Sequence, residues 1–276
     1  MSSPRNLLLV LLAQGLLAAP VLRAQTTTVS SLADYAGPRY PGGPDSLRAL
    51  VYRSTRQAGI TPVGKTLLLF EIGADGRPAN FKLIAPPGPI NIPLLRAAGT
   101  AVDYLQARML TWQPEAPDPE AKPAAEPAQN ALILDFSNSS PDTMPYSYAD
   151  QFPRFPAMEK LLGARQFRHG DPSLADPVKW AAFISSTRGL VAYVQMNVRY
   201  PPEALRYQQQ GRVYASFEVA ETGAIEHVEI LGTAGRALDV EVLRTVQQLP
   251  AAGSPALLHG RPVRVHYALP ITFRIQ

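Results

Sequence analysis

The sequence predicts an α+β fold in which small antiparallel β-sheets pack with helices on one face. Three observations support this prediction: a β-hairpin pattern over residues 211–230, a helical repeat of apolar residues directly after it, and a final segment, residues 260–276, that alternates apolar and polar side chains. With 276 residues, 46% of them hydrophobic and only 17% charged, the chain has enough apolar side chains to fill the cores of one or two domains.

The hairpin is indicated by its alternation and by its turn. Its first strand places apolar side chains at every second position, namely Val213, Ala215, Phe217 and Val219. The turn is Glu221-Thr222-Gly223, because glycine adopts the positive φ that tight turns require. The returning strand carries Ile225, Val228 and Ile230.

The residues before and after the hairpin are predicted to form helices. After it, apolar residues recur at Leu238, Val242, Val246 and Leu249. Before it, we expect a helix over Gly189–Val198 and a short helix that ends near Tyr207 and is capped by Gly211. The alternative for the polar segment 207–210 is a contact surface for a bound peptide.

The last strand is the clearest in the chain. Its apolar positions are Val263, Val265, Tyr267, Leu269, Ile271, Phe273 and Ile275. Pro270 lies on the other face, and proline favours a sheet edge or a strand end because it cannot donate a ladder hydrogen bond. An open edge can accept a strand from a partner, but proline also blunts edges, so the sequence leaves both alternatives open.

The first half of the chain resembles a divergent copy of the second. Residues 64–84 align with residues 211–231 at one constant offset, which pairs Gly64 with Gly211, Phe70 with Phe217 and Gly76 with Gly223. The following positions Leu94, Ala98, Val102 and Leu105 repeat the helical spacing, and Leu132, Leu134 and Phe136 match Leu269, Ile271 and Phe273. We interpret this as an internal repeat; the alternative is two unrelated hairpin-and-helix units.

The remaining segments define the expected domain boundaries. Residues 1–24 are interpreted as a secretory signal peptide that ends at Ala24, although an uncleaved membrane anchor is the alternative. The apolar run is shorter than the roughly 20 residues that a membrane span needs. We expect a linker at 25–38, a first domain at 39–138 with a Pro-rich loop at 114–129, and a second domain at 146–276.

Composition and motifs exclude several classes of function. The chain has no cysteine, which excludes a disulfide framework. Its net charge of +4 falls to +2 once Arg5 and Arg23 leave with the signal peptide, too weak a charge to indicate nucleic-acid binding. His227 and His266 lie in strands that could be neighbours, but two histidines lack the third ligand of a metal site. No catalytic or phosphate-binding motif is present, so we expect no enzyme, no cofactor, no metal and no small-molecule substrate.

Three motifs together resemble a known family. Tyr200-Pro201-Pro202-Glu203-Ala204 precedes the hairpin, and Leu238-Asp239 opens the helix after it. The order YPxxA, GxVxxxFxVxxxGxIxxVxI, LDxxxLxxV, over roughly Arg188 to Gln276, is similar to the C-terminal domain of TonB, the periplasmic energy transducer. The resemblance implies two TonB-C-like α+β units, of which the first is divergent and lacks YPxxA.

The same resemblance implies a function. It indicates a periplasmic protein-binding module, linked to energy transduction and to transport through outer-membrane TonB-dependent transporters. In that family the C-terminal strand pairs with a short transporter peptide by strand addition. This places the partner-binding edge at Val263, Val265, Tyr267, Leu269, Ile271 and Phe273.

One alternative to this function remains open from the sequence. A soluble periplasmic interaction or scaffold protein would keep the fold without transducing energy. Transducers of the family carry a histidine in their membrane helix, and residues 1–24 contain none. The expected location is the periplasm, or the inner membrane if the N-terminal segment stays uncleaved.

Overall fold

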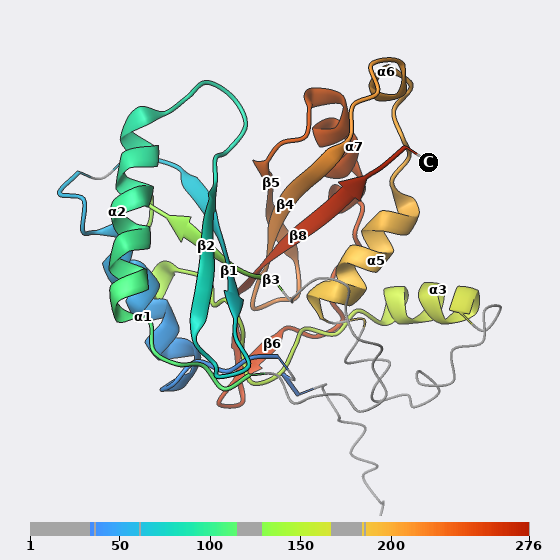
Figure 1. Ribbon diagram of the computed structural model, residues 1–276. Coiled ribbons are helices and arrows are strands. Elements are labelled where there is room, and N and C mark those ends of the chain that lie inside the picture. The colour runs from blue at the N-terminus through green and yellow to red at the C-terminus, as the bar shows by residue number, and fades with distance from the viewer. Residues whose placement is uncertain are drawn as a thin grey trace, which may run out of the picture. The chain divides into compact units, whose positions relative to one another are not determined.

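The first half of the chain builds a three-stranded antiparallel sheet with two helices on one face (Figure 1). The structure is a computed structural model that describes residues 34–35, 37–60, 62–114, 129–166, 184 and 186–275. The sheet has the order β2-β1-β3, formed by β1 (Lys65–Ile72), β2 (Pro78–Ile84) and β3 (Gln129–Asp135). The helices are α1 (Gly43–Thr55) and α2 (Ile92–Arg108).

The second half repeats this arrangement. Its sheet has the order β5-β4-β8, formed by β4 (Gly211–Val219), β5 (Ile225–Gly232) and β8 (Val265–Phe273). The helices on one face are α5 (Thr187–Asn197) and α7 (Arg236–Gln247) (Figure 1). Shorter elements complete it: η1 (Pro141–Thr143), α3 (Pro156–Gln166), α6 (Pro202–Arg206), β6 (Ala256–Leu258) and β7 (Arg261–Val263). The predicted α+β class, with small antiparallel sheets and helices, is confirmed.

The two hairpins agree in detail at positions that the sequence alignment pairs. The register shifts between Leu69 and Glu71 in one hairpin and between Ser216 and Glu218 in the other. Asn80 and His227 each follow with a positive φ, 54° and 52°, which is uncommon outside glycine. The side chain of each is hydrogen-bonded to the aligned glutamate: Asn80 Nδ2 donates to Glu71 at 2.6 Å, and His227 Nδ1 lies 2.9 Å from the carboxylate of Glu218.

Three hydrophobic clusters hold the fold together. One contains Phe70 and lies between the first sheet and helices α1 and α2. Another contains Phe217 and lies between the second sheet and helices α5 and α7. The third joins residues of both sheets, namely Leu67, Leu69, Ile133, Tyr214 and Leu231. The helix-free faces of the two sheets therefore pack against each other, and residues 31–276 form one compact unit.

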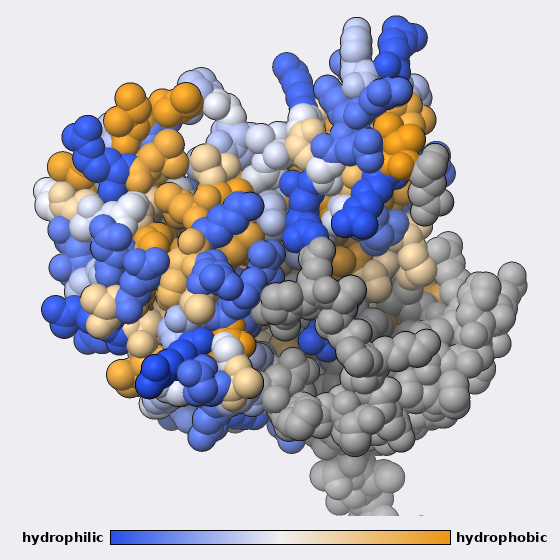
Figure 2. Space-filling model, in the orientation of Figure 1, coloured by the Kyte–Doolittle hydropathy of each residue, from blue (hydrophilic) through white to orange (hydrophobic). Residues whose placement is uncertain are grey.

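The face drawn in Figure 2 carries both polar and apolar residues. Figure 2 shows apolar residues gathered at the upper left, over the loop that joins β2 to α2, where Ile90 is 80% exposed and Ile92 60%. Over the described residues, no helix combines the length and the apolar character that a membrane crossing requires.

The structure corrects two details of the expected elements. The final strand is divided at Arg264, whose carbonyl accepts a hydrogen bond from Tyr146, so β7 pairs with β6 while β8 joins the main sheet. Gly211 does not cap α6, because it is the first residue of β4. Gln208, with a φ of 50°, ends that helix instead.

Several predicted segments lie outside the described residues. These are the signal peptide at 1–24, most of the linker at 25–38, and residues 115–128 of the Pro-rich loop.

Candidate functional site at a sheet edge

Strand β8 lies at one side of the second sheet. The order β5-β4-β8 gives it a single neighbour in that sheet, β4, with which it pairs antiparallel from Val265 opposite Val219 to Phe273 opposite Gly211. An edge strand presents a row of backbone N–H and C=O groups on its outer side. The outer side of β8 is therefore a place where another strand can be added.

Pro270 determines which residues of β8 present their backbone to the outer side. It pairs with Tyr214, and it has no N–H to donate. In an antiparallel pair, residues alternate between exchanging both hydrogen bonds with their partner and pointing both groups away from it. Pro270 belongs to the second set, and so do His266, Ala268 and Thr272. Hydrogen bonds from the amides of His266 and Thr272 to groups outside the sheet agree with this assignment.

Most of the six residues predicted to bind a partner direct their backbone groups toward β4 and not toward the outer side of β8. Five of them lie on β8, have buried side chains and direct their backbone N–H and C=O groups toward β4: Val265, Tyr267, Leu269, Ile271 and Phe273. Val263 lies on β7, opposite Ala256 of β6. These residues therefore hold the edge strand in place, while Ala268 and Pro270 present the outward groups. The sequence contained the signal, because a proline can only occupy an outward position on a paired edge strand.

The chain itself covers the first part of this edge. The amide of Tyr146 donates to the carbonyl oxygen of Arg264 at 2.9 Å, and its carbonyl accepts from the amide of His266 at 3.0 Å. Tyr146 thus lies opposite Val265 and bonds to the residues on either side of it, which is the hydrogen-bond pattern of a parallel strand pair. The edge of β8 thus accepts an extended backbone within this molecule.

Helix α1 of the first half fixes Tyr146 in this position. The Tyr146 hydroxyl donates to Oδ1 of Asp45 at 2.7 Å, and the Arg48 guanidinium lies 4.0 Å from the ring centroid. Burial and the hydrogen bond to Asp45 raise the pKa of Tyr146 to about 12, so the hydroxyl remains a donor at any physiological pH.

A glutamine side chain covers the far part of the edge. Nε2 of Gln195 on α5 donates to the Thr272 carbonyl oxygen at 2.8 Å, and Oε1 accepts from the Thr272 amide at 3.2 Å. Between Tyr146 and Gln195, the N–H and C=O of Ala268 and the C=O of Pro270 have no hydrogen-bond partner within the described residues. These three groups form a short window of backbone without hydrogen-bond partners in the described part of the chain, while the Ala268 side chain packs against the cluster between the two sheets.

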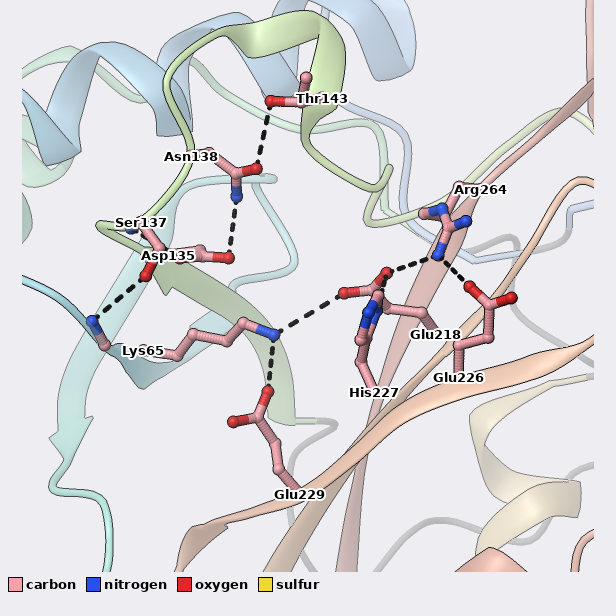
Figure 3. Close-up of polar contacts among 11 residues, drawn as sticks. Lys65, Asp135, Ser137, Asn138, Thr143, Glu218, Glu226, His227, Glu229 and Arg264 are labelled. Atoms are coloured by element: carbon pink, nitrogen blue, oxygen red, sulfur yellow. Dashed lines mark hydrogen bonds and ion pairs between the residues drawn. The ribbon is translucent and has the colours of Figure 1, made fainter.

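A polar cluster lies beside the window, centred on Glu218 of β4 (Figure 3). Glu218 accepts hydrogen bonds from His227 at 2.9 Å and from Arg264 at 3.1 Å. Lys65 of the first sheet lies 3.7 Å from Glu218 and 2.6 Å from Glu229. Arg264 also donates to Glu226 at 2.6 Å. The cluster therefore ties β1 of the first half to β4 and β5 of the second.

Each carboxylate of this cluster is paired with Lys65 or Arg264. Burial raises the pKa of Glu218, but the hydrogen bonds from His227 and Arg264 and the nearby Lys65 charge outweigh burial and lower it. Burial lowers the pKa of Lys65, whereas pairing with Glu229 raises it, with a net rise. The adjoining cleft of about 290 Å³ is lined by four residues of the cluster, Lys65, Glu218, His227 and Arg264, together with Asp135, Asn138, Thr143 and Pro145. Because these charges are already paired, the arrangement favours a structural link over a ligand site.

The YPxxA motif lies beside the C-terminal end of β8. The Tyr200 ring packs edge-on against Phe273, with ring centroids 5.4 Å apart, and its hydroxyl donates to the carbonyl of Gln209. Gln210 accepts a hydrogen bond from the amide of Ile275 at 3.0 Å. Tyr207 remains 66% exposed. The motif thus anchors the start of the second sheet, and its neighbour Tyr207 adds an exposed aromatic side chain.

These features define a class of protein: a small α+β domain with helices on one face of an antiparallel sheet and an edge strand that can accept a strand. Residues 196–275 match the family described as the Gram-negative bacterial TonB protein C-terminal. This part of the chain contains the sheet with the order β5-β4-β8, and the match confirms for it the resemblance to the TonB C-terminal domain that the sequence motifs indicate.

One solved structure is similar to part of the chain. The NMR solution structure of the Helicobacter pylori TonB C-terminal domain is 18% identical, and the match covers 31% of this chain and 88% of that one. Its TM-score of 0.24 is too low to support an argument about fold or function. No curated protein matches the chain.

Proposed function

We propose that this chain is a periplasmic protein-binding module that docks an extended segment of an outer-membrane TonB-dependent transporter as a strand added to β8. By this proposal it belongs to the machinery that transduces energy for transport across the outer membrane, and it binds a protein without catalysing a reaction. The TonB C-terminal match over residues 196–275 supports a TonB-like module, and the open edge of β8 supports the mode of binding.

The observation that carries the proposal is the open window at Ala268 and Pro270. Backbone groups at this position face outward, and the adjacent Tyr146 segment already pairs with the same edge. Strand addition draws its affinity mainly from backbone hydrogen bonds, so it needs such an edge and no particular side chain. An added strand would satisfy the N–H and C=O of Ala268 and the C=O of Pro270.

The first sheet has a matching edge that we do not expect to bind. Ala131 of β3 lies opposite Leu69, which the alignment pairs with Ser216, the partner of Ala268. The amide of Phe136 donates to Gly64, so by alternation Ala131 also faces outward. Strand β3 spans seven residues against nine in β8, and it follows the Pro-rich segment. Ala131 thus offers a matched control position.

Proline substitution at these two alanines tests the proposal. Synthetic peptides that copy the N-terminal segments of TonB-dependent transporters are titrated against the wild type, Ala268→Pro and Ala131→Pro by fluorescence anisotropy. Each proline removes one outward N–H and leaves the inner ladder intact. We expect Ala268→Pro to weaken binding at least tenfold and Ala131→Pro to leave it unchanged, with folding checked by circular dichroism. Equal binding by all three proteins would remove β8 as the docking edge.

The periplasmic location has its own test. We propose that residues 1–24 are removed and that the mature chain starts at Gln25, because the apolar run is short and ends at Pro20. Intact-mass measurement of the protein from the periplasmic fraction decides this. Recovery of a chain that retains Met1 in the inner-membrane fraction would support the anchored alternative instead.

A further inference from the structure

The side chain of Gln195 imitates a neighbouring strand at the end of the β8 edge. A primary amide carries one acceptor oxygen and an NH₂ donor, the same groups that a peptide unit offers. Gln195 directs both at one residue, Thr272, with bonds of 2.8 Å and 3.2 Å. Thr272 is an outward residue of β8, so Gln195 occupies the groups that a docked strand would use.

The Gln195 side chain, which caps Thr272, can move away while helix α5 stays in place. Gln195 is exposed, whereas Val194 beside it is fully buried and fixes α5 against the second sheet. The glutamine side chain can therefore swing into solvent without moving its helix. The first sheet shows no such cap within the described residues: Asp135, which matches Thr272, bonds through its side chain to Ser137 and Asn138.

We propose that Gln195 is a specificity-determining residue of this edge, which ends the docking site at Pro270 and must leave Thr272 before a longer strand can pair. This inference rests on the proposed function of β8. Tyr146 bounds the other end through His266, so the window between the two caps spans Ala268 to Pro270. A segment that docks in register at Ala268 without reaching Thr272 binds with the cap closed, and one that extends past Pro270 competes with the cap.

The partner that fits this window is an extended peptide that forms only a few backbone hydrogen bonds with β8. Pro270 offers a carbonyl and no amide, so the peptide residue opposite it can donate an N–H but finds no donor for its own C=O. A peptide with a water-exposed turn or chain end at that point fits better than a long regular strand. The caps thus select short extended segments over the edges of folded sheets.

The test uses the full chain with the transporter-derived peptides named above. Their affinity is compared for the wild type, Gln195→Ala and the matched control Asn197→Ala. Asn197 lies on the same helix and is exposed, and within the part of the chain that the structure describes its side chain donates only to the carbonyl of Tyr193. For a peptide long enough to reach Thr272, we expect Gln195→Ala to tighten binding about tenfold, because two backbone groups become available. Asn197→Ala should leave the affinity within about twofold.

The amide NMR signal of Thr272 distinguishes the possible results. In the wild type, peptide should shift the signal of Ala268 and leave Thr272 largely unchanged; in Gln195→Ala, both should shift. Binding to Gln195→Ala alone would also support the cap. Wild-type binding at Ala268 with unchanged or weaker binding by Gln195→Ala would overturn the role of Gln195 and leave the β8 proposal standing. Self-association of Gln195→Ala without a gain in peptide affinity would likewise overturn it. No binding to any of the proteins would refute both proposals.

Discussion

At the residue scale, one stacked aromatic pair joins neighbouring strands in each sheet. Phe217 is fully buried and stacks on Tyr267 of the neighbouring strand with ring centroids 5.2 Å apart. Phe70, its counterpart in the first half, is 1% exposed and stacks on Phe81. The alternation of residues 213–219 predicted the buried position of Phe217, because a buried face in a strand recurs every second residue, and the alignment of the two halves predicted the same position for Phe70.

Truncation of Phe217 tests this packing. We expect Phe217→Ala to lower the free energy of unfolding by roughly 3–5 kcal/mol, as removal of a buried aromatic ring leaves a cavity. Tyr207→Ala is the control, and because Tyr207 is 66% exposed it should change stability by less than about 0.5 kcal/mol. Urea unfolding measures both. A loss below about 1 kcal/mol for Phe217→Ala would show that this ring is not part of the core.

The buried His266 should make the free energy of unfolding depend on pH. Burial lowers its pKa from 6.5 to about 4; Glu218 opposes this shift and Lys65 adds to it. Its Nε2 atom is buried without a partner within the described residues, so protonation there is costly. The unfolded chain therefore binds this proton more readily than the folded chain between pH 6.5 and 4, and stability falls as pH falls through that window.

A glutamine at position 266 isolates this effect. From pH 7 to pH 5 the wild type should lose about 2 kcal/mol through His266, and His266→Gln should lose correspondingly less over the same interval. Thermal or urea unfolding at the two pH values measures the difference. Parallel pH profiles for the two proteins would show that His266 is not buried in its neutral form.

At the element scale, the hairpin turns are fixed by glycine. Gly223 has a φ of 84°, and a Cβ atom there would lie 2.5 Å from the carbonyl oxygen of Ala252. The amide of Ala252 also donates to the Gly223 carbonyl, so the two segments cannot separate easily. Gly76 has the same relation to Trp112 in the first half. The turn was predictable from Glu221-Thr222-Gly223, but the segment that packs on it was not.

Alanine at Gly223 should cost more than backbone strain alone. We expect Gly223→Ala to lower stability by about 3 kcal/mol, from the left-handed φ and from the close contact with Ala252. Gly260→Ala is the matched control, because Gly260 has a φ of 73° with no atom within 4 Å of the added Cβ, and should cost about 1 kcal/mol. Equal losses in urea unfolding would show that the loop at Ala252 moves aside.

Element boundaries show where sequence reasoning stops. The unbroken alternation from Val263 to Phe273 predicted one strand, but Arg264 bonds Tyr146 through its carbonyl and two glutamates through its guanidinium, which divides the strand. Helix α5 begins at Thr187, two residues before the predicted start, because the Ser186 hydroxyl accepts from the amide of Gly189. Both differences arise from contacts with residues that no local pattern identifies.

At the scale of the whole molecule, the packing of the two sheets was the main feature missed in the sequence. Leu67, Leu68, Leu69 and Phe70 form a continuous apolar run in β1, and such a run indicates a strand buried on both faces. Leu68 and Phe70 face the helices, whereas Leu67 and Leu69 face the second sheet. The first half thus covers the helix-free face of the second sheet and, through Asp45 and Tyr146, reaches the start of the β8 edge.

Hydrogen exchange at the Ala268 amide tests the central proposal most directly. Ala268 presents its N–H on the side of β8 that faces away from β4, and a docked strand would give that N–H an acceptor. We predict that saturating transporter peptide slows exchange at Ala268 at least tenfold and leaves Ala131, the matching residue of the first sheet, unchanged. Exchange at Ala268 that is unaltered while the peptide is demonstrably bound would contradict docking by strand addition at β8.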